Sequence, residues 1–513
     1  MNHSKKVITL ILVVTSVYLL MSVFSNEFIG YYPNFKNVNL LSDILVKEKT
    51  KKGGSKSKED GHSVLGDNVP KNEFEAYEKK DALIRFNADT VAPALPKLTQ
   101  KLIALSEGKN VKIRIAWFGD SQIEGDLITQ DVREQLQNYF GQQKGVGFIP
   151  ISCVSSDFRI TAKVSTTGDF KVDNFKKQEH NSSLFLSGYS FYSKNLEIVF
   201  RDNVNKNSTQ ITQKWLLYGK GDSISVKIND SVKKYPANLE FNRILVGSDV
   251  SNKSKFTVFA KQTPIYGVSS EPQSGIILDN FSFRGITGVE LKKINNDLLS
   301  EINRSGYYDL IVFQYGVNLM FRPNDTNYDY YYSAMLPVLK KFQNNMPNTE
   351  FLLFSCSDRA FNYGGEWKTA IGIDSLIHTQ ARMAYDADIP FYNFYKSNGG
   401  SGTMVKWADS TVQHASKDYI HFNFRGAKAV SKIIFKALMH DYQKTVKLKK
   451  AGKPIVVTPI LINKPAIKEQ ILTKKDTPKP TTKKAVAQKQ KVVKEIIPRE
   501  VVPEPPVKKG DSI

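Results

Sequence analysis

Four short apolar runs, separated by helix-like stretches, constrain the fold of this 513-residue chain more than any other feature. The runs are "VKIRIAWFG", "YDLIVFQYG", "TEFLLFSCS" and "DIPFYNFY". Stretches such as "YYYSAMLPVLKKFQNN" and "IDSLIHTQARMAYDA" lie between them and have the spacing of helices with one buried face. Continuous apolar strands that alternate with helices are typical of a parallel sheet covered on both faces. The sequence therefore predicts an α/β domain.

The stretch 157–273 interrupts this rhythm. Its short runs alternate apolar and polar residues, as in Leu196, Ile198 and Phe200, and turn residues separate the runs. Such a pattern is typical of an all-β sandwich. We therefore expect an all-β sandwich domain inserted into a loop of the α/β domain, where insertions are tolerated. The α/β domain is then divided into residues 86–156 and 274–443, and the insert contributes binding rather than chemistry.

The N-terminus predicts attachment to a membrane. Lys5 and Lys6 precede an uncharged apolar run from Val7 to Phe24, which is longer than the usual signal-peptide core of about 7–15 residues. We expect residues 1–25 to form an uncleaved signal anchor, with cleavage after Ser25 as the alternative. The lysines stay in the cytoplasm, and the rest of the chain lies on the exported, periplasmic or extracellular side. Residues 26–85 contain "KEKTKKGGSKSKEDGHS" and are expected to form a flexible linker.

About half of the net charge of +22 lies in the C-terminal tail, residues 444–513, where 18 basic residues stand against 6 acidic ones. The tail is rich in Pro, Val, Thr and Lys and has no aromatic residue, which predicts a disordered, extended arm. A tether to the wall or membrane surface and a solubilising tail both fit this composition. Nucleic acid is not expected as a partner, because the globular part has no basic stripe with interleaved aromatic residues.

The two cysteines, Cys153 and Cys356, lie in apolar, strand-like contexts, which favours two buried thiols over a disulfide. No spacing typical of metal ligands is present, and no metal or cofactor is expected.

Polar residues that follow the apolar runs form a candidate catalytic set. Ser121, in "AWFGDSQIEGD", follows the first run, at the strand end where α/β folds place their sites. Asp418 and His421 precede a helix-like stretch in "KDYIHFNFRG". A serine becomes a good nucleophile when a histidine accepts its proton and a carboxylate orients that histidine. Asn318 and Gly288 offer an amide and a backbone N–H to a developing oxyanion.

Each motif alone is usually a turn or a helix cap. Their order, each at a strand end, favours catalysis. Together, Gly119-Asp120-Ser121, the "RGITG" glycines, Gly316-Val317-Asn318 and Asp418-x-x-His421 resemble the four blocks of the SGNH/GDSL hydrolases. The resemblance covers roughly residues 113–137 and 275–440. The chain departs from the family pattern at Gln122, where the family name has Leu, and at Leu319, where Asp is usual.

This resemblance implies a flavodoxin-like three-layer fold. It also implies that Ser121 is the nucleophile, that Asp418 and His421 complete the triad, and that Ser121, Gly288 and Asn318 form the oxyanion hole. The spacing leaves Gly285 as an alternative to Gly288.

The position of the insert, between the first and second blocks, is similar to that of a β-sandwich insert in bacterial peptidoglycan and polysaccharide O-acetylesterases. This resemblance implies that the inserted sandwich is carbohydrate-binding-like. "NGGSGTMVKW" followed by "KDYIHFNFRGAKAV" is similar to relatives that act on acetylated polysaccharides. The resemblance implies an exported serine esterase that removes O-acetyl groups from an envelope or extracellular polysaccharide through an acetyl-enzyme. Two alternatives are an O-acetyltransferase that works with envelope acetylation machinery and a non-catalytic glycan-binding protein. Trp215, Tyr218 and Tyr266 could stack on a sugar, although packing in the sandwich is the default for aromatic residues.

Overall fold

A computed structural model describes residues 74–455 except 87, 89, 142 and 178–183. Its central sheet has five parallel strands in the order β13-β1-β14-β15-β18, which is 2-1-3-4-5 in chain order and matches the flavodoxin-like arrangement. The strands are β1 (Lys112–Gly119), β13 (Gly275–Ser282), β14 (Leu310–Gln314), β15 (Glu350–Phe354) and β18 (Phe391–Tyr392). The predicted parallel α/β sheet is therefore confirmed.

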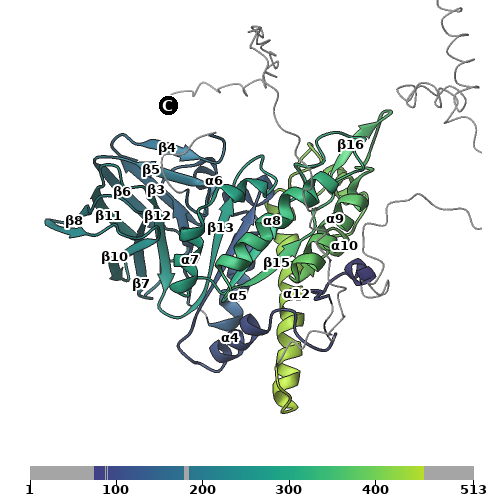
Figure 1. Cartoon of the computed structure of the whole chain (residues 1–513), viewed down its shortest axis with the longest axis horizontal. Coiled ribbons are helices and arrows are strands. Elements are labelled where there is room, and N and C mark those ends of the chain that lie inside the picture. Colours follow the sequence, from purple (N-terminus) through teal and green to yellow (C-terminus); the bar gives the residue numbers. More distant parts are fainter. Residues whose placement is uncertain (1–73, 87, 89, 142, 178–183, 456–513) are drawn as a thin grey trace, which may run out of the picture. The chain divides into compact units, whose positions relative to one another are not determined.

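Helices cover both faces of this sheet (Figure 1). One face packs against α4 (Pro96–Ser106), α5 (Thr129–Phe140) and α12 (Phe424–Lys450). The other face carries α7 (Asn296–Arg304), α8 (Asp329–Asn345) and α9 (Ile373–Ala387). Shorter elements are η2 (Glu75–Glu78), η3 (Ser121–Asp126), α6 (Val154–Phe158), η4 (Val289–Lys293), α10 (Phe394–Ser397), α11 (Thr403–Asp409) and the hairpin β16 (Ala360–Tyr363) and β17 (Glu366–Thr369).

Alternation along β1 explains the two layers of helices. Ile115 and Trp117 point into one apolar core, together with residues of α5 and α12. Phe118 points the other way, and its ring lies 5.7 Å from those of Phe313 in β14 and Phe342 in α8. A strand that is apolar on both faces must be covered on both faces, and β1 is an interior strand that pairs with β13 and β14.

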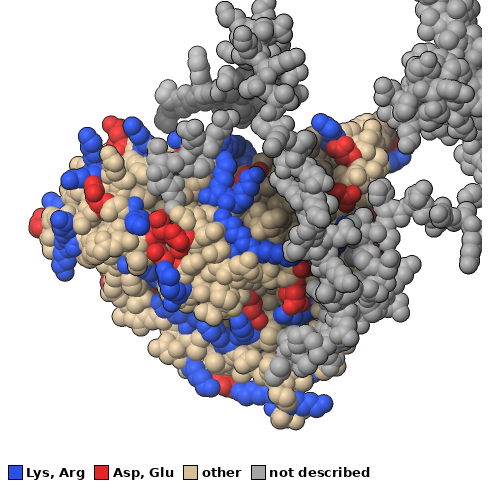
Figure 2. All heavy atoms as spheres, viewed as in Figure 1, with Lys and Arg blue, Asp and Glu red and all other residues tan. Residues whose placement is uncertain are grey.

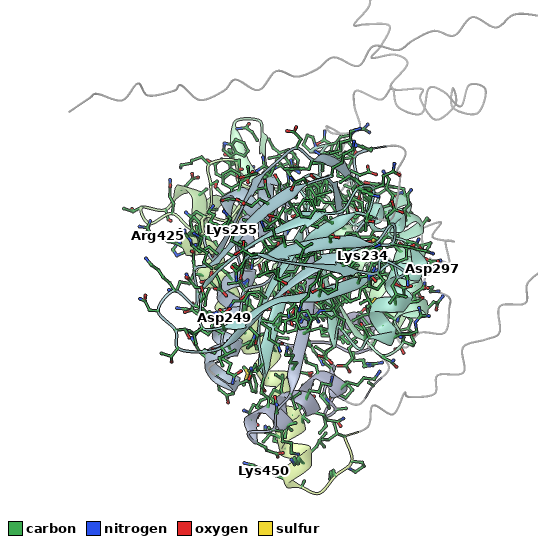
Figure 3. The ribbon with its side chains drawn as sticks, turned by 90° about the vertical axis from the view of Figure 1, so that its left-hand side faces the viewer. Lys234, Asp249, Lys255, Asp297, Arg425 and Lys450 are labelled. Atoms are coloured by element: carbon green, nitrogen blue, oxygen red, sulfur yellow. The ribbon has the colours of Figure 1, made fainter. Side chains whose placement is uncertain are left out.

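The insert is an antiparallel sandwich of two sheets around its own apolar core (Figure 3, which looks onto these strands). One sheet has the order β10-β7-β12-β5-β4, with β2 also paired to β12, and the other has the order β3-β6-β11-β8-β9. The strands are β2 (Gly147–Pro150), β3 (Ala162–Thr167), β4 (Lys171–Asn174), β5 (Tyr189–Tyr192), β6 (Leu196–Asp202), β7 (Thr212–Tyr218), β8 (Ile224–Ile228), β9 (Ser231–Tyr235), β10 (Asn242–Asp249), β11 (Lys253–Phe259) and β12 (Ile265–Pro272). The β-structure therefore begins at β2, ten residues before the predicted start at 157.

Buried ion pairs join the sandwich to the α/β domain, and we call them the seam. Arg114 of β1 lies 2.7 Å from Glu271 of β12, and Arg159, just after α6, lies 3.1 Å from Asp126 of η3. Arg133 of α5 also pairs with Asp126. These side chains are at most 5% exposed. A buried charge is tolerated only when it is paired, so the seam fixes the insert against the sheet.

The carboxylate of Glu271 is the most heavily paired group in the seam. Burial alone raises its pKa, but the guanidinium groups of Arg114 and Arg243 and the ammonium group of Lys112 outweigh burial and lower the pKa to about 2. Arg243 Nη2 lies 2.8 Å from this carboxylate. Glu271 is therefore ionised in the folded protein near neutral pH.

Two predicted boundaries are wrong. The flexible linker was expected to reach residue 85, but Phe74, Leu83 and Ile84 are buried, and Ile84 forms an antiparallel bridge with Phe391 of β18. The disordered tail was expected to begin at 444, but α12 continues to Lys450, because Thr445 is buried with its Oγ1 2.7 Å from that of Thr99. The predicted signal anchor, the linker up to residue 73 and the tail from residue 456 lie outside the described residues.

No helix within the described ranges is long and apolar enough to cross a membrane. Cys356 is buried and Cys153 is half-buried, and both are free thiols.

Candidate active site

Ser121 begins η3 just beyond β1, an interior strand of the sheet. The preceding Asp120 caps this turn, because its Oδ1 accepts a hydrogen bond from the backbone N–H of Gln122 at 3.0 Å. Burial raises the pKa of Asp120 to about 7, partly offset by this hydrogen bond and by His421. The turn thus presents Ser121 at the carboxyl end of the sheet, as the sequence predicted.

His421 connects Ser121 to Asp418. Its Nε2 lies 2.7 Å from Ser121 Oγ, and its Nδ1 lies 2.7 Å from Asp418 Oδ2. Asp418 Oδ1 accepts the backbone N–H groups of Ile420 and His421, each at 3.0 Å. Burial alone raises the pKa of Asp418, but the hydrogen bonds from His421 and Ile420 outweigh it and lower the pKa to about 2. An ionised Asp418 holds the proton on Nδ1, so Nε2 is left to accept the proton of Ser121.

Asp418 does not cap the helix that follows it. The cap of α12 is Asn423, whose Oδ1 accepts the backbone N–H groups of Arg425 and Gly426, each at 3.0 Å. The structural interpretation of Asp-x-x-His as a helix cap is therefore wrong, and the carboxylate of Asp418 is directed to His421.

A pocket of about 590 Å³ opens above Ser121 and His421. It is also lined by Glu124, Gly125, Leu127, Phe158, Arg284, Gly285, Asn318 and Phe424. Residues far apart in the sequence therefore meet at one cavity, which is large enough for a sugar unit or a short acyl group.

Of the two candidate oxyanion glycines, Gly285 lies in the pocket and Gly288 does not. Gly288 caps η4 with φ of 93°, and a Cβ there would lie 2.7 Å from the ring of Tyr315. A side chain at Gly288 would therefore collide with Tyr315, and of the two glycines Gly285 is the one that lines the pocket. The backbone N–H of Gly285 donates no hydrogen bond to another described residue.

Asn318 lies in the same pocket, on the loop after β14. Its Nδ2 donates to the carbonyl of Ile286 at 2.9 Å, which leaves the second N–H of the amide for a ligand. Arg359 steadies this loop, because its Nη1 donates to the carbonyl of Val317 at 2.7 Å.

In the sequence, Gln122 stands out only because it replaces a leucine of the family motif. Its side chain is buried, and Nε2 donates to the carbonyl of Ile420 at 3.0 Å and contacts Ser357 Oγ. Gln122 therefore ties the turn that carries the nucleophile to the residue before His421. The departure from the motif was the only signal in the sequence.

Two aromatic rings and an ion pair in the pocket wall were also missed. Phe158 and Phe424 are 63% and 55% exposed, and Arg284 Nε lies 3.0 Å from Glu124 Oε2. Phe158 belongs to α6, before the first strand of the second sandwich sheet. The inserted region therefore supplies part of the pocket wall.

The three aromatic residues of the insert that were considered for sugar stacking lie elsewhere. Tyr218 and Tyr266 are buried, and their hydroxyl groups donate to backbone carbonyls of Pro236 and Glu240. Trp215 is covered by the guanidinium of Arg243, 3.9 Å from the ring centre. Packing explains all three residues.

Over the described ranges, no group of three or more His, Cys, Asp or Glu side chains could hold a metal ion.

Comparison with known proteins identifies solved structures of similar architecture. A peptidoglycan O-acetylesterase matches with a TM-score of 0.57 and 18% identity, over 70% of this chain and 99% of that chain. A family two carbohydrate esterase from Cellvibrio japonicus (10% identity, 55% of this chain and 99% of that one) and an acetyl xylan esterase (16%, 32% and 80%) have TM-scores of 0.24, too low to carry an argument. No protein-family model matches the chain, and no curated protein matches its sequence.

At 18% identity, the match shows a shared fold and not a shared activity. The match spans nearly the whole of the peptidoglycan O-acetylesterase, and therefore includes more than a minimal five-stranded core. The resemblance to SGNH/GDSL esterases that the four sequence motifs indicated is thereby confirmed at the level of the fold.

Proposed function

We propose that this protein is a serine esterase that removes O-acetyl groups from a polysaccharide, such as peptidoglycan or another envelope or extracellular glycan. One observation carries the proposal: Ser121, His421 and Asp418 are joined by two hydrogen bonds of 2.7 Å at the edge of an open pocket. Serine hydrolases use this arrangement to generate a nucleophile.

The reaction proceeds in two halves. Nε2 of His421 takes the proton of Ser121, whose Oγ attacks the acetyl carbonyl carbon. The backbone N–H groups of Ser121 and Gly285 and the amide of Asn318 stabilise the oxyanion. His421 then gives its proton to the departing sugar oxygen, which leaves acetyl-Ser121. A water molecule, deprotonated by His421, attacks this ester and releases acetate, and the proton returns to Ser121.

A polysaccharide substrate is supported by the shape and lining of the pocket. The faces of Phe158 and Phe424 offer flat apolar surfaces to the C–H face of a sugar ring, while Arg284 and Glu124 offer hydrogen-bonding groups to its hydroxyls. The shared fold with a peptidoglycan O-acetylesterase is consistent with this substrate class.

The site of action is a further part of the proposal. The apolar run from Val7 to Phe24, preceded by two lysines, supports a membrane anchor with the catalytic domain on the exported side. Protease added to intact cells or spheroplasts should digest the catalytic domain of the full-length protein and spare a cytoplasmic control. Protection of the domain until the membrane is lysed would contradict export.

Activity is tested with full-length protein, p-nitrophenyl acetate and O-acetylated polysaccharides, in the presence and absence of an unacetylated acceptor. Release of acetate into water alone supports the esterase. Acetylation of the acceptor would instead support an O-acetyltransferase that works with envelope acetylation machinery. Binding to glycans without turnover of any acetyl donor would support a non-catalytic glycan-binding function.

A further inference from the structure

A cluster of lysines lies on the face that carries α7 and α8. In the view of Figure 2, Lys and Arg side chains gather in a band on this face. We call the cluster the lysine track, and its members are Lys176, Lys177, Lys292, Lys293, Lys340 and Lys341. The three pairs come from the insert, from η4 and from α8.

Contacts between the pairs make the track continuous. Lys293 Nζ donates to the carbonyl of Lys177 at 2.7 Å, which joins the first pair to the second. Lys341 Nζ donates to the carbonyl of Lys292 at 2.8 Å, which joins the second pair to the third. Two of the lysines thus hold the three segments together.

The charges of the track are poorly compensated. Lys177 lies 3.7 Å from Asp173, but no described carboxylate comes within 4.0 Å of the ammonium groups of the other five lysines. Lys176, Lys292 and Lys340 are exposed. Charges of one sign gathered on one face attract and guide ligands of the opposite sign, and the attraction falls with ionic strength.

The track runs from the pocket to a second depression. At one end, Lys176 Nζ lies 6.0 Å from the ring centre of Phe283, the neighbour of the pocket residue Arg284. At the other end, Lys340 and Lys341 line an open depression of about 640 Å³. Three side-chain amides, those of Asn296, Asn344 and Asn345, line the same depression. Amides and ammonium groups together can bind the hydroxyls and carboxylates of a sugar.

We propose that the lysine track binds an acidic stretch of the substrate, so that the preferred polysaccharide carries carboxylate groups near the acetylated unit that enters the pocket. This inference rests on the proposed esterase function and specifies its substrate class. The track connects three segments in succession and ends in a polar depression, which favours an extended polymer over a flat anionic membrane.

The test compares acetylated acidic and neutral polymers. Full-length protein is assayed with O-acetylated polygalacturonate, O-acetylated xylan and p-nitrophenyl acetate, and its variant K176E/K292E/K340E is assayed in parallel. The variant should lose about tenfold or more of kcat/KM on the acidic polymer and keep its activity on the other two substrates, because rim charges act mainly on association. Raising the ionic strength from about 0.01 M to about 1 M should remove most of the wild-type preference.

The matched control is K227E/K233E/K234E, which reverses three exposed lysines of β8 and β9 in the sandwich; Lys234 is labelled in Figure 3. An equal loss of activity in this control would overturn the inference, since net charge alone would then explain the effect. A wild-type enzyme that prefers neutral polymer would also overturn it while leaving the esterase intact. If K176E/K292E/K340E kept the wild-type kinetics but no longer bound vesicles of phosphatidylglycerol, the inference would also be overturned. No turnover of any of the three substrates would instead refute the proposed function.

Discussion

The pocket and the seam use the same kinds of charged side chains in opposite surroundings. In the seam, the side chains of Arg114, Glu271 and Asp126 are at most 5% exposed. In the pocket, the side chains of Asp418 and His421 are 44% and 37% exposed. Both regions are held by ion pairs or charged hydrogen bonds near 2.7 Å.

The difference in exposure separates folding from catalysis. When a buried charge loses its partner, no water can take the partner's place, so the free energy of unfolding falls. A half-exposed pair can be solvated when its partner is removed, so the fold tolerates the loss while the reaction does not. We therefore expect substitutions in the pocket to change rates and substitutions in the seam to change stability.

The largest expected effect is that of Ser121→Ala. The variant should lose about 10⁴-fold or more in kcat on p-nitrophenyl acetate, because a triad acts as a unit. Its midpoint of thermal unfolding should stay within a degree or two, since the change removes one hydrogen bond at a partly exposed site. Activity near that of the wild type would refute the assignment of the nucleophile, and a large loss of stability would break the distinction between the two regions.

Glu271→Gln should have the next largest effect, on stability. Removing one member of a buried charged cluster costs about 3–5 kcal/mol in the free energy of unfolding. The folded pKa of Glu271 is about 2 and the unfolded pKa about 4.3, so this stabilisation is present above about pH 4.3 and is lost as the pH falls toward 2.

Denaturant titrations of wild type and Glu271→Gln between pH 3 and pH 7 would measure this contribution. The difference between the proteins should narrow at acidic pH, and kcat of the folded variant should equal that of the wild type. The matched control is Glu366→Gln, which changes an exposed glutamate paired with Lys368 and should leave unfolding unchanged. A difference independent of pH would mean that the charge of Glu271 is not what stabilises the seam.

Asn318→Ala should lower kcat by about 10²–10³-fold, the usual effect of removing one oxyanion donor. KM should change little, because the donor acts mainly on the transition state. Asn348→Ala, at an exposed site outside the pocket, is the control and should be silent. Equal loss from both would indicate a folding defect rather than a missing donor.

Gln122→Leu tests a buried residue that directly follows the nucleophile Ser121. Leucine keeps most of the volume but cannot donate to the carbonyl of Ile420, so His421 should be held less firmly. We expect kcat to fall about tenfold with KM unchanged, which corresponds to the cost of about 1–3 kcal/mol for an unpaired buried group. A lower melting temperature with unchanged kcat would show that Gln122 is structural only.

The sequence was sufficient to predict the sheet and the triad. The strands are apolar on both faces, and Ser121, Asp418 and His421 lie in short motifs whose residue types are dictated by the chemistry. The sequence could not decide between Gly285 and Gly288, because both glycines have positive φ and only their three-dimensional surroundings, the pocket and the ring of Tyr315, distinguish them.

The seam could not be predicted for a different reason. Arg159 and Asp126 are 33 positions apart and belong to different domains, so no local pattern links them. The two ends of the α/β domain could not be predicted either, because they too depend on contacts between distant residues. The sequence around Ile84 resembles a linker and that around Thr445 resembles a charged tail, and only contacts with distant residues order them.

The bridge between Ile84 and Phe391 has a consequence for aggregation. The strand β18 is two residues long and lies at the edge of the sheet, where free N–H and C=O groups invite pairing with another molecule. Ile84 occupies this edge through backbone hydrogen bonds of 2.7 and 2.8 Å with Phe391. A shortened protein that begins after Phe86 would leave these groups open to a second chain, so a soluble version has to retain the segment from Phe74 onward.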